Sequence, residues 1–217
     1  MDVSLRRLRA EDISQVVEIE REAFSPLWVS TPFKRDLNNR YASYLVACRC
    51  DPEVGALDTS TIEDFAKESS LMGRVASLAG ILLGRRPVQN NPESYVAGYV
   101  SVWYQGEEAH ITEIAVREPL RGKGIGELLL IGALCSAVKY GSKVMTLEAR
   151  VSNFIAQRLY EKYDFRSMGI RKGYYSDNRE DAVIMTTSPI LANEYQEMFQ
   201  ERQEAYRSRW GAIHIHS

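Results

Sequence analysis

Residues 111–127, ITEIAVREPLRGKGIGE, read as a strand, a glycine-rich loop and the start of a helix. The apolar run from Ile111 to Val116 has the length and flanks of a buried strand, and an apolar stretch from 125 to 140 predicts the helix. A glycine turn at a helix N-terminus presents unpaired N–H groups and the positive end of the helix dipole. The loop between them is therefore typical of a phosphate-binding site.

The spacing of the glycines narrows the choice of phosphate. A P-loop would carry lysine and then serine or threonine after its last glycine, whereas Glu127 follows Gly126 here. A dinucleotide-binding loop would need a further glycine at 127 or 129, and these positions hold Glu127 and Leu129. What remains is an R-x-x-G-x-G pattern from Arg121 to Gly126, and an ordinary glycine-rich turn stays open as the alternative.

Composition restricts the class of protein. The chain has 217 residues, 24.7 kDa and a net charge of −2, enough for one substantial core and without a global charge that favours nucleic acid or a membrane surface. Three cysteines and three histidines are too few and too scattered to predict a metal site. The N-terminus lacks a secretory apolar region, and no apolar run reaches the ~20 residues of a membrane span. We expect a cytoplasmic protein without a transmembrane segment or direct nucleic-acid binding.

The remaining pattern predicts a mixed α/β domain. Gly141 is placed to end the helix that begins near 125, and Ser152 is placed to begin a second helix. The expected elements, in chain order, are a strand at 3–9, a helix at 10–24, strands at 41–50 and 93–105, a strand at 111–116, a helix at 125–140, a strand at 143–150, a helix at 152–163, and strands at 165–172 and 181–187.

Two segments stand apart from this alternation. Residues 51–94 are too long for a hairpin turn, and a capping-box pattern at Ser60 predicts a helix that ends near Gly84. Its broad apolar face is expected to dock a partner, to lie on a membrane or to pack on its own domain. Residues 191–217 form a charged tail, which we expect to be a solvated helix up to Trp210.

Several motifs together resemble the GNAT acyl-CoA N-acetyltransferases. Arg121, Gly124 and Gly126 match that family's pyrophosphate loop, and TEIAV before it resembles the family's cofactor strand. TLEARVSNFIAQRLYEKYDF and GIRKGYYSDNREDAVIM are similar to the bacterial ribosomal-protein alanine N-acetyltransferases, the RimI group. The resemblance covers about 1–50 and 95–187. Asp164 departs from it, since the family has glycine there, but aspartate tolerates a left-handed turn.

The resemblance implies an α/β GNAT fold, with a mixed, mostly antiparallel central sheet that is flanked by helices and splayed at the acetyl-CoA site. The domain would span residues 1–190, with the helical insertion at about 51–94 and the tail at 191–217.

Two residues are candidates for catalysis. Strand alternation puts Glu148 on a polar face, and Asn153 and Tyr160, seven residues apart, share a helix face. The resemblance assigns Glu148 as the general base and Tyr160 as the acid that protonates the leaving thiolate, without a metal. The alternative is that Glu148 pairs with Arg150 and that Tyr160 fills the core. Glu113 is a second possible base, since some GNAT enzymes use an acid on this strand.

The resemblance also assigns binding residues. Backbone groups of the strand would hold the pantetheine and acetyl carbonyl, the loop would hold the pyrophosphate, and an amide would hold the pantetheine arm. These cofactor-binding residues are Ile114, Ala115, Val116, Arg121, Gly122, Lys123, Gly124, Ile125, Gly126 and Asn153. Phe24 and Pro26 in the AFSPLW loop, with Tyr174 and Tyr175, would enclose a peptide N-terminus, unless these side chains are plain aromatic core.

The expected activity is transfer of an acetyl group from acetyl-CoA to the N-terminal α-amine of a protein, with a ribosomal protein and an N-terminal alanine as the family's typical substrate. An α-amine has a pKa near ~8, against ~10.4 for lysine, so a carboxylate base suffices more easily for it. A lysine or small-amine acetyltransferase and a non-catalytic acyl-CoA-binding assembly partner are the alternatives.

Overall fold

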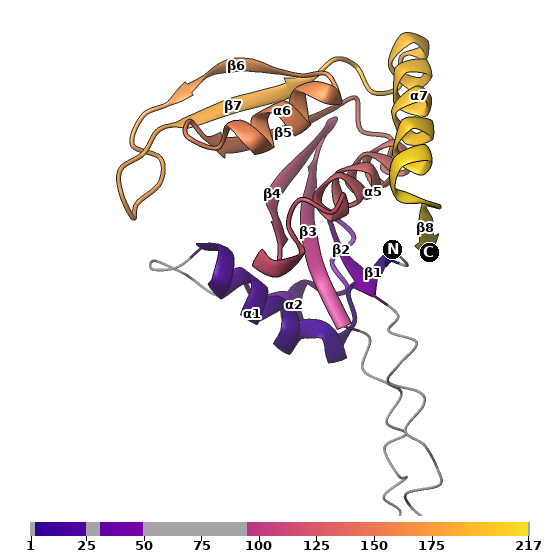
Figure 1. Ribbon diagram of the computed structural model, residues 1–217. Coiled ribbons are helices and arrows are strands. Elements are labelled where there is room, and N and C mark those ends of the chain that lie inside the picture. The colour runs from indigo at the N-terminus through magenta and orange to yellow at the C-terminus, as the bar shows by residue number, and fades with distance from the viewer. Residues whose placement is uncertain (1–2, 25–30, 50–94, 217) are drawn as a thin grey trace, which may run out of the picture. The chain divides into compact units, whose positions relative to one another are not determined.

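The computed structural model describes residues 3–24, 31–49 and 95–216 (Figure 1). The chain divides into two compact units, residues 1–49 with 96–217, and residues 50–95. Almost all of the second unit, including the expected insertion at 51–94, lies outside the described residues. The described elements, which apart from Tyr95 belong to the first unit, are β1 (Val3–Arg7), a 3-10 turn (Ala10–Asp12), α1 (Ile13–Phe24), α2 (Phe33–Asp36), β2 (Ala42–Arg49), β3 (Tyr95–Gln105), β4 (Glu108–Val116), a 3-10 turn (Glu118–Leu120), α5 (Ile125–Tyr140), β5 (Val144–Arg150), α6 (Phe154–Lys162), β6 (Phe165–Arg171), β7 (Ala182–Thr187), α7 (Asn193–Trp210) and β8 (His214–His216).

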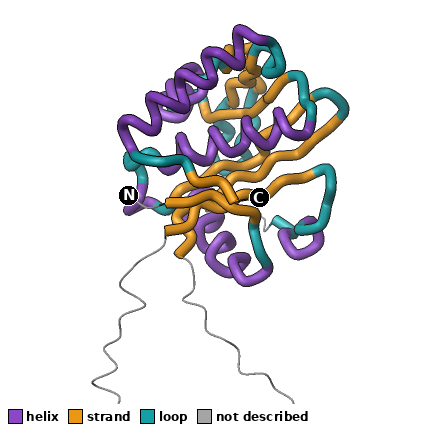
Figure 2. Tube along the Cα trace, turned by 90° about the vertical axis from the view of Figure 1, so that its right-hand side faces the viewer, coloured by secondary structure: helices purple, strands orange, loops and turns teal. Residues whose placement is uncertain are grey.

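The described strands form one mixed sheet in the order β6-β7-β5-β4-β3-β2-β1-β8. Strands β4 and β5 pair in parallel, as do β1 and β8, whereas the β1–β2, β3–β4, β5–β7 and β6–β7 pairs are antiparallel. Helices cover both faces of the sheet (Figure 2). The prediction of a mixed, mostly antiparallel sheet flanked by helices is confirmed.

Strands β4 and β5 are paired along only part of their length. The pairing runs from Glu108 with Val144 to Ile111 with Leu147, although β4 continues to Val116 and β5 to Arg150. Two parallel strands that stop exchanging hydrogen bonds leave backbone groups open along the edges that face each other. The sheet is therefore splayed next to the glycine loop.

A bulge in β4 changes which side chains face which side. The register between β3 and β4 shifts so that Ser101 pairs with Glu113 while Val102 pairs with Ile111. Ile111 belongs to the core cluster that includes α5, whereas Glu113 contacts Tyr99 and Thr31 on the α1 side. An extra residue in one strand reverses the alternation beyond it. The bulge thus carries Glu113 to the opposite face from Ile111.

The ends of α5 lie where the sequence predicts them, whereas the N-cap of α6 is one residue later than predicted. Gly124 and Gly141 flank α5 in left-handed conformations, with φ of 79° and 88°. Helix α6 takes Asn153 as its N-cap in place of the expected Ser152, because Asn153 Oδ1 accepts a hydrogen bond from the N–H of Ala156. The N–H of Ser152 instead donates to Glu180.

The C-terminal tail forms a helix, but the expectation that it is solvated is wrong on one side. Helix α7 buries Tyr195, Phe199 and Tyr206, which recur at helical spacing among charged residues. It lies beside α5 in Figure 1. Helix α5 is apolar around most of its circumference, so it needs cover on the side that the sheet does not reach, and α7 supplies that cover.

The other expectations concern cysteine, metal and membrane. Cys48 is buried and Cys135 partly buried, whereas Cys50 lies outside the described residues. Within the described part of the chain, no group of three or more His, Cys, Asp or Glu side chains is arranged to hold a metal ion. None of the helices there has the length and apolar character needed to cross a bilayer.

Candidate active site

Glu148 lies one residue beyond the last pair between β5 and β4, on the polar face of β5. Its carboxylate contacts His110 Nε2 at 3.1 Å and Arg171 Nη1 at 3.0 Å, and its side chain is about nine-tenths buried. His110 comes from β4 and Arg171 from the end of β6, so three strands converge on this carboxylate. A second His110 nitrogen, Nδ1, is 2.8 Å from Thr146 Oγ1, which fixes the orientation of the ring.

Arg150, the alternative partner of Glu148, forms its ion pairs with other acids. Arg150 binds Asp177 at 2.7 Å and Glu180 at 3.1 Å, both in the turn between β6 and β7. The Arg150 guanidinium also lies over the ring of Tyr175, with its carbon 3.9 Å from the ring centre. Arg150 therefore holds the β6–β7 turn and leaves Glu148 to other partners.

Tyr174 and Tyr175 line the same region. Their rings meet edge to face with centres 5.1 Å apart, and the guanidinium carbon of Arg171 lies 5.3 Å from the Tyr174 ring centre. Tyr174 is 43% exposed, which argues against the reading of this ring as plain core. Burial raises the pKa of Tyr175 to about 12, against the opposing effect of Arg150.

Tyr160 faces the interior from α6. Its side chain is buried and its ring centre lies 5.8 Å from that of Phe165. Burial, with a smaller contribution from Tyr175, raises the pKa of the Tyr160 phenol above its ordinary value of 10. The phenol is thus held in its protonated form at neutral pH. Asn153, at the start of the same helix, is exposed, and its Oδ1 is occupied by the N-cap hydrogen bond.

Glu113 belongs to a second carboxylate cluster on the same face of the sheet. Its Oε2 accepts a hydrogen bond from the Tyr99 hydroxyl at 2.9 Å, and its Oε1 lies 3.1 Å from Thr31 Oγ1. Thr31 also donates through its N–H and hydroxyl to Glu20, which is buried. Burial first, and then the nearby Glu20, raise the pKa of Glu113, which Tyr99 and Thr31 partly oppose.

The glycine loop has the features of an anion cradle. Gly122 and Gly124 have φ of 74° and 79°, a region that other residues enter only with strain. The backbone N–H groups of residues 122–127 have no hydrogen-bond acceptor among the described residues. Arg121 Nε donates to the carbonyl of Val116 at 3.2 Å, which ties the loop to the end of β4. Lys123 is exposed beside the loop.

The residues expected to bind the donor therefore lie in two connected places. Ile114, Ala115 and Val116 form the part of β4 that has parted from β5, and Gly122, Gly124, Ile125 and Gly126 lead into α5. A Cβ at Gly122 would meet nothing within 4 Å, so the space in front of that residue is open. Open strand edges beside a helix N-terminus with free N–H groups fit a donor that carries an amide-rich arm and a pyrophosphate.

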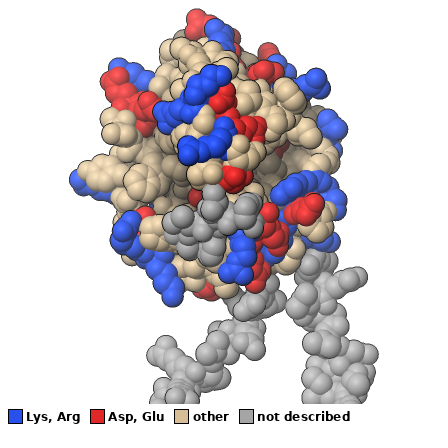
Figure 3. All heavy atoms as spheres, turned by 90° about the vertical axis from the view of Figure 1, so that its left-hand side faces the viewer, with Lys and Arg blue, Asp and Glu red and all other residues tan. Residues whose placement is uncertain are grey.

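Only some of the residues expected to enclose a peptide N-terminus lie among the described residues. Phe24, the last residue of α1, is 38% exposed, whereas Pro26 lies outside the described residues. The β6–β7 turn and α1 both lie toward the left of Figure 1, and Figure 3 shows that side. Lysine and arginine side chains lie beside acidic ones there, so the face has no large patch of a single sign.

Four partners of the candidate residues were not predicted, namely His110 and Arg171 at Glu148, and Thr31 and Tyr99 at Glu113. Strand alternation from Thr146 and Glu148 would have marked the shared face of β5. It could not have reached His110 or Arg171, because their contacts depend on the register of three strands.

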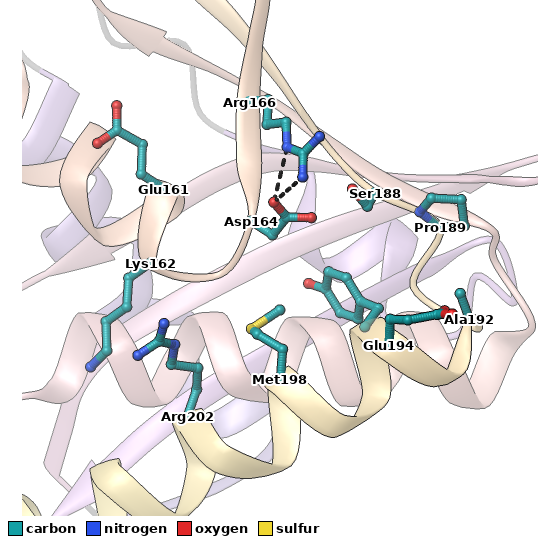
Figure 4. A pocket seen from close by; sticks show the side chains of 11 residues that line it. Glu161, Lys162, Asp164, Arg166, Ser188, Pro189, Ala192, Glu194, Met198 and Arg202 are labelled. Carbon is teal, nitrogen blue, oxygen red and sulfur yellow. Dashed lines mark hydrogen bonds and ion pairs between the residues drawn. The ribbon is translucent and has the colours of Figure 1, made fainter.

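A separate cavity of about 370 Å³ lies away from these residues, between the end of α6, the segment after β7 and the first half of α7 (Figure 4). Asp164, which adopts the left-handed turn that the sequence allowed, accepts from Arg166 at its edge. Charges of both signs line the cavity, among them Glu161, Lys162 and Arg202. It shares no residue with the Glu148 cluster or the glycine loop.

Comparison with known proteins gives one consistent result. Residues 13–165 match the model of the Acetyltransferase (GNAT) family. A putative ribosomal protein bS18-alanine N-acetyltransferase of Bacillus subtilis is 32% identical over 183 residues, which cover 84% of this chain and 93% of the relative. An N-alpha-acetyltransferase of Saccharolobus solfataricus is 28% identical over 85% of this chain and 92% of its own.

Solved structures agree on the fold. The crystal structure of the ribosomal-protein-S18-alanine N-acetyltransferase from Escherichia coli superposes with a TM-score of 0.60 at 23% identity, over 88% of this chain and 97% of that one. Ard1 from Thermoplasma volcanium gives a TM-score of 0.60 at 19% identity, over 86% and 97%. With the splayed sheet and the glycine loop, these matches establish that the chain belongs to the GNAT acetyltransferase family.

Proposed function

We propose that this protein transfers the acetyl group of acetyl-CoA to the N-terminal α-amine of a protein, with the N-terminal alanine of a ribosomal protein as the preferred substrate. Membership of the GNAT family implies acetyl-CoA as the donor. The choice of an α-amine is supported by the relatives from Bacillus subtilis and Saccharolobus solfataricus, whose names specify alanine N-acetylation and N-alpha-acetylation.

The observation that carries the proposal is the position of Glu148 at the fork between β4 and β5. The open edge of β4 beyond Ile111 is where a thioester arm fits, and Glu148 is the first residue of β5 beyond the fork that faces the α1 side. A carboxylate at this point is within reach of an amine that approaches the thioester from that side. Its role is that of a general base.

The chemistry follows from the order of the proton transfers. The neutral α-amine attacks the acetyl carbonyl carbon, so a C–N bond forms while the C–S bond breaks. The excess amine proton passes to Glu148, directly or through one water. The leaving thiolate takes its proton from the hydroxyl of Tyr160, since a phenol with an ordinary pKa near ~10 carries its proton at neutral pH. The N–H groups of residues 122–127 hold the donor's pyrophosphate.

The acceptor would lie between α1 and the β6–β7 turn. Arg150 fixes this turn through Asp177 and Glu180, and Tyr174 presents a partly exposed ring next to Arg171. Tyrosine side chains suit the first residues of an extended peptide, because the ring can pack on its side chains while the hydroxyl bonds its backbone N–H and C=O groups. An enclosure of this kind favours a chain end over a lysine in the middle of a folded surface.

Mass spectrometry of the acetylated products tests the proposal. The protein is incubated with acetyl-CoA and a set of peptides that differ in their first residue and contain one internal lysine. Each peptide is also supplied with a blocked α-amine. We expect acetylation at the α-amine, greatest for N-terminal alanine, and none on the blocked peptides. Acetylation of the lysine in blocked peptides would establish the lysine-directed alternative, and acetylation of neither amine would favour the non-catalytic one.

A further inference from the structure

The C-terminal helix lies outside the family match, which ends at residue 165, yet its buried side chains belong to the same core cluster as α5. The Tyr195 hydroxyl donates to the carbonyl of Tyr163 at 3.0 Å, and the rings of Tyr163 and Phe199 lie edge to face with centres 6.2 Å apart. Figure 4 shows Arg202 of α7 directed toward Lys162 at the end of α6, and Met198 directed into the cavity between them and β7. Helix α7 is therefore an integral part of this side of the domain.

The last residue of α7 reaches the glycine loop. A Cβ built on Gly124 would lie 2.7 Å, 2.8 Å and 2.9 Å from three ring atoms of Trp210. Distances this short mean that the indole rests directly on the Cα of Gly124, in space that a side chain would otherwise fill. Only glycine at position 124 accommodates the indole in this place.

The chain segments before and after Trp210 are both anchored in the fold. Before Trp210, α7 buries Tyr206 in the core, and after it Gly211 turns with φ of 101° into β8. Strand β8 pairs in parallel with β1, with Ile215 opposite Leu5. The guanidinium carbon of Arg209, the preceding residue, lies 4.9 Å from the centre of the ring. The position of the indole is thus determined by the fold of the whole tail.

The conformation of Gly124 sets the direction in which the N–H groups of the loop point. Gly124 is the N-cap of α5, with φ of 79° and ψ of −5°, and it stands in the middle of the N–H groups that have no acceptor among the described residues. Glycine has the largest backbone freedom of any residue, so a loop of glycines loses the most entropy when it is ordered around a ligand. An aromatic ring packed on Gly124 removes part of that freedom before the ligand arrives.

We propose that Trp210 is a positioning residue for the acyl donor: its indole holds Gly124 in the left-handed conformation in which the loop N–H groups receive the pyrophosphate. The inference rests on acetyl-CoA as the donor, which family membership implies, and not on the identity of the acceptor. It gives the tail a role in donor binding that the family match, confined to residues 13–165, does not contain.

Calorimetric titration of the full-length protein with acetyl-CoA tests this role. We expect Trp210→Ala to weaken acetyl-CoA binding about tenfold, which corresponds to about 1.4 kcal/mol. In turnover measurements the KM for acetyl-CoA should rise, while kcat at saturating acetyl-CoA stays near that of the wild type. Trp210→Phe keeps a flat ring on Gly124 and is expected to restore most of the affinity. Arg209→Ala, the matched control, removes the neighbouring cation but keeps the ring, and its affinity should fall much less than that of Trp210→Ala.

Three results would overturn the inference. A folded Trp210→Ala variant with unchanged Kd would show that the ring does not position the loop, and a tighter Kd would make the indole an obstacle in the site. A larger loss in Arg209→Ala than in Trp210→Ala would assign the effect to charge. If Trp210→Ala fails to fold, Trp210→Leu, which fills similar space without a flat ring, replaces it and must bind more weakly than Trp210→Phe. A wild-type protein that bound no acetyl-CoA would overturn the donor assignment as well.

Discussion

Ile111 of β4 and Leu147 of β5 are the last paired residues of these two strands, and the residues that follow them are the candidate machinery. On β5 the next residue is Glu148, and on β4 the bulge next to Ile111 turns Glu113 to the same face of the sheet. The split between the strands thus opens a backbone edge and presents two carboxylates beside it. The two acids have different surroundings, and this difference separates their roles.

The two left-handed glycines of the loop should respond differently to an added methyl group. Gly122→Ala and Gly124→Ala each place a Cβ where φ is positive, which costs roughly 1–2 kcal/mol. Only Gly124→Ala also collides with Trp210. We expect Gly124→Ala to lose more thermal stability than Gly122→Ala, and both to bind acetyl-CoA more weakly in calorimetry. Equal losses of stability would mean that the indole moves away without cost.

Glu113 should make stability depend on pH in a defined direction. Its pKa in the folded protein is raised above 4.5, so the carboxyl stabilises the fold below that pH and loses this contribution as the pH rises through the folded pKa. Glu113→Gln cannot ionise. The melting temperature of Glu113→Gln relative to the wild type should therefore increase from about pH 4 to about pH 8. Glu107→Gln, an exposed acid, is the control and should show no such trend.

Turnover of the same variant separates the two carboxylates. A base must lose its proton before each cycle, and burial beside Glu20 disfavours the ionised form of Glu113. We expect Glu113→Gln to keep turnover within about threefold of the wild type, far from the loss of a general base. A fall of a hundredfold or more would transfer the base role to Glu113.

Much of the fold was predictable because its signals are local. The run from Ile125 to Tyr140 was predicted as a helix with the bounds it has, since its apolar character and the glycines at both ends are read from adjacent residues. Helix α2 was not predicted, because four residues next to Pro32 give no periodic pattern. The packing of the tail against the core was missed as well, since three buried aromatic side chains among many charged ones resemble a solvated helix.

The candidate site divides in the same way. The glycine loop was predicted from its motif, and alternation placed Glu148 on a polar face; both are properties of one segment, whereas the role of Glu148 was implied by the resemblance. His110, Arg171 and Trp210 were missed, because each reaches its partner through strand register or helix docking between distant segments. The bulge in β4 adds a further limit, since alternation counted from Ile111 would put Glu113 on the wrong face.

Tyr160→Phe tests the proposed acid. The ring stays in its place against Phe165, so the core should remain packed and acetyl-CoA affinity should change little, while turnover falls because the thiolate loses its proton donor. Tyr195→Phe is the matched control, because it removes a buried hydroxyl that donates to Tyr163 far from the proposed chemistry. It should lower stability and leave turnover unchanged. If the two variants behaved alike in both measurements, Tyr160 would be a core residue only.

Glu148→Gln gives the most direct test of the mechanism. The amide keeps the shape of the side chain but cannot accept a proton, so the rate near neutral pH should fall by roughly 10²–10⁴. The loss should shrink at high pH, where the α-amine, with a pKa near ~8, deprotonates unaided. Glu161→Gln, an exposed acid on α6, controls for the change of charge and should keep the wild-type rate.

The partners of Glu148 allow a second reading of the same experiment. Loss of the carboxylate also removes the ion pair with Arg171, so a purely structural role predicts a lower melting temperature with an unchanged pH–rate profile. Arg171→Met breaks this ion pair but keeps the base, and it should lower stability without the pH dependence of Glu148→Gln. Glu148 is identified as a general base if the rate loss of Glu148→Gln becomes smaller as the pH rises while that of Arg171→Met does not. Only the first variant has lost the group that takes the amine proton.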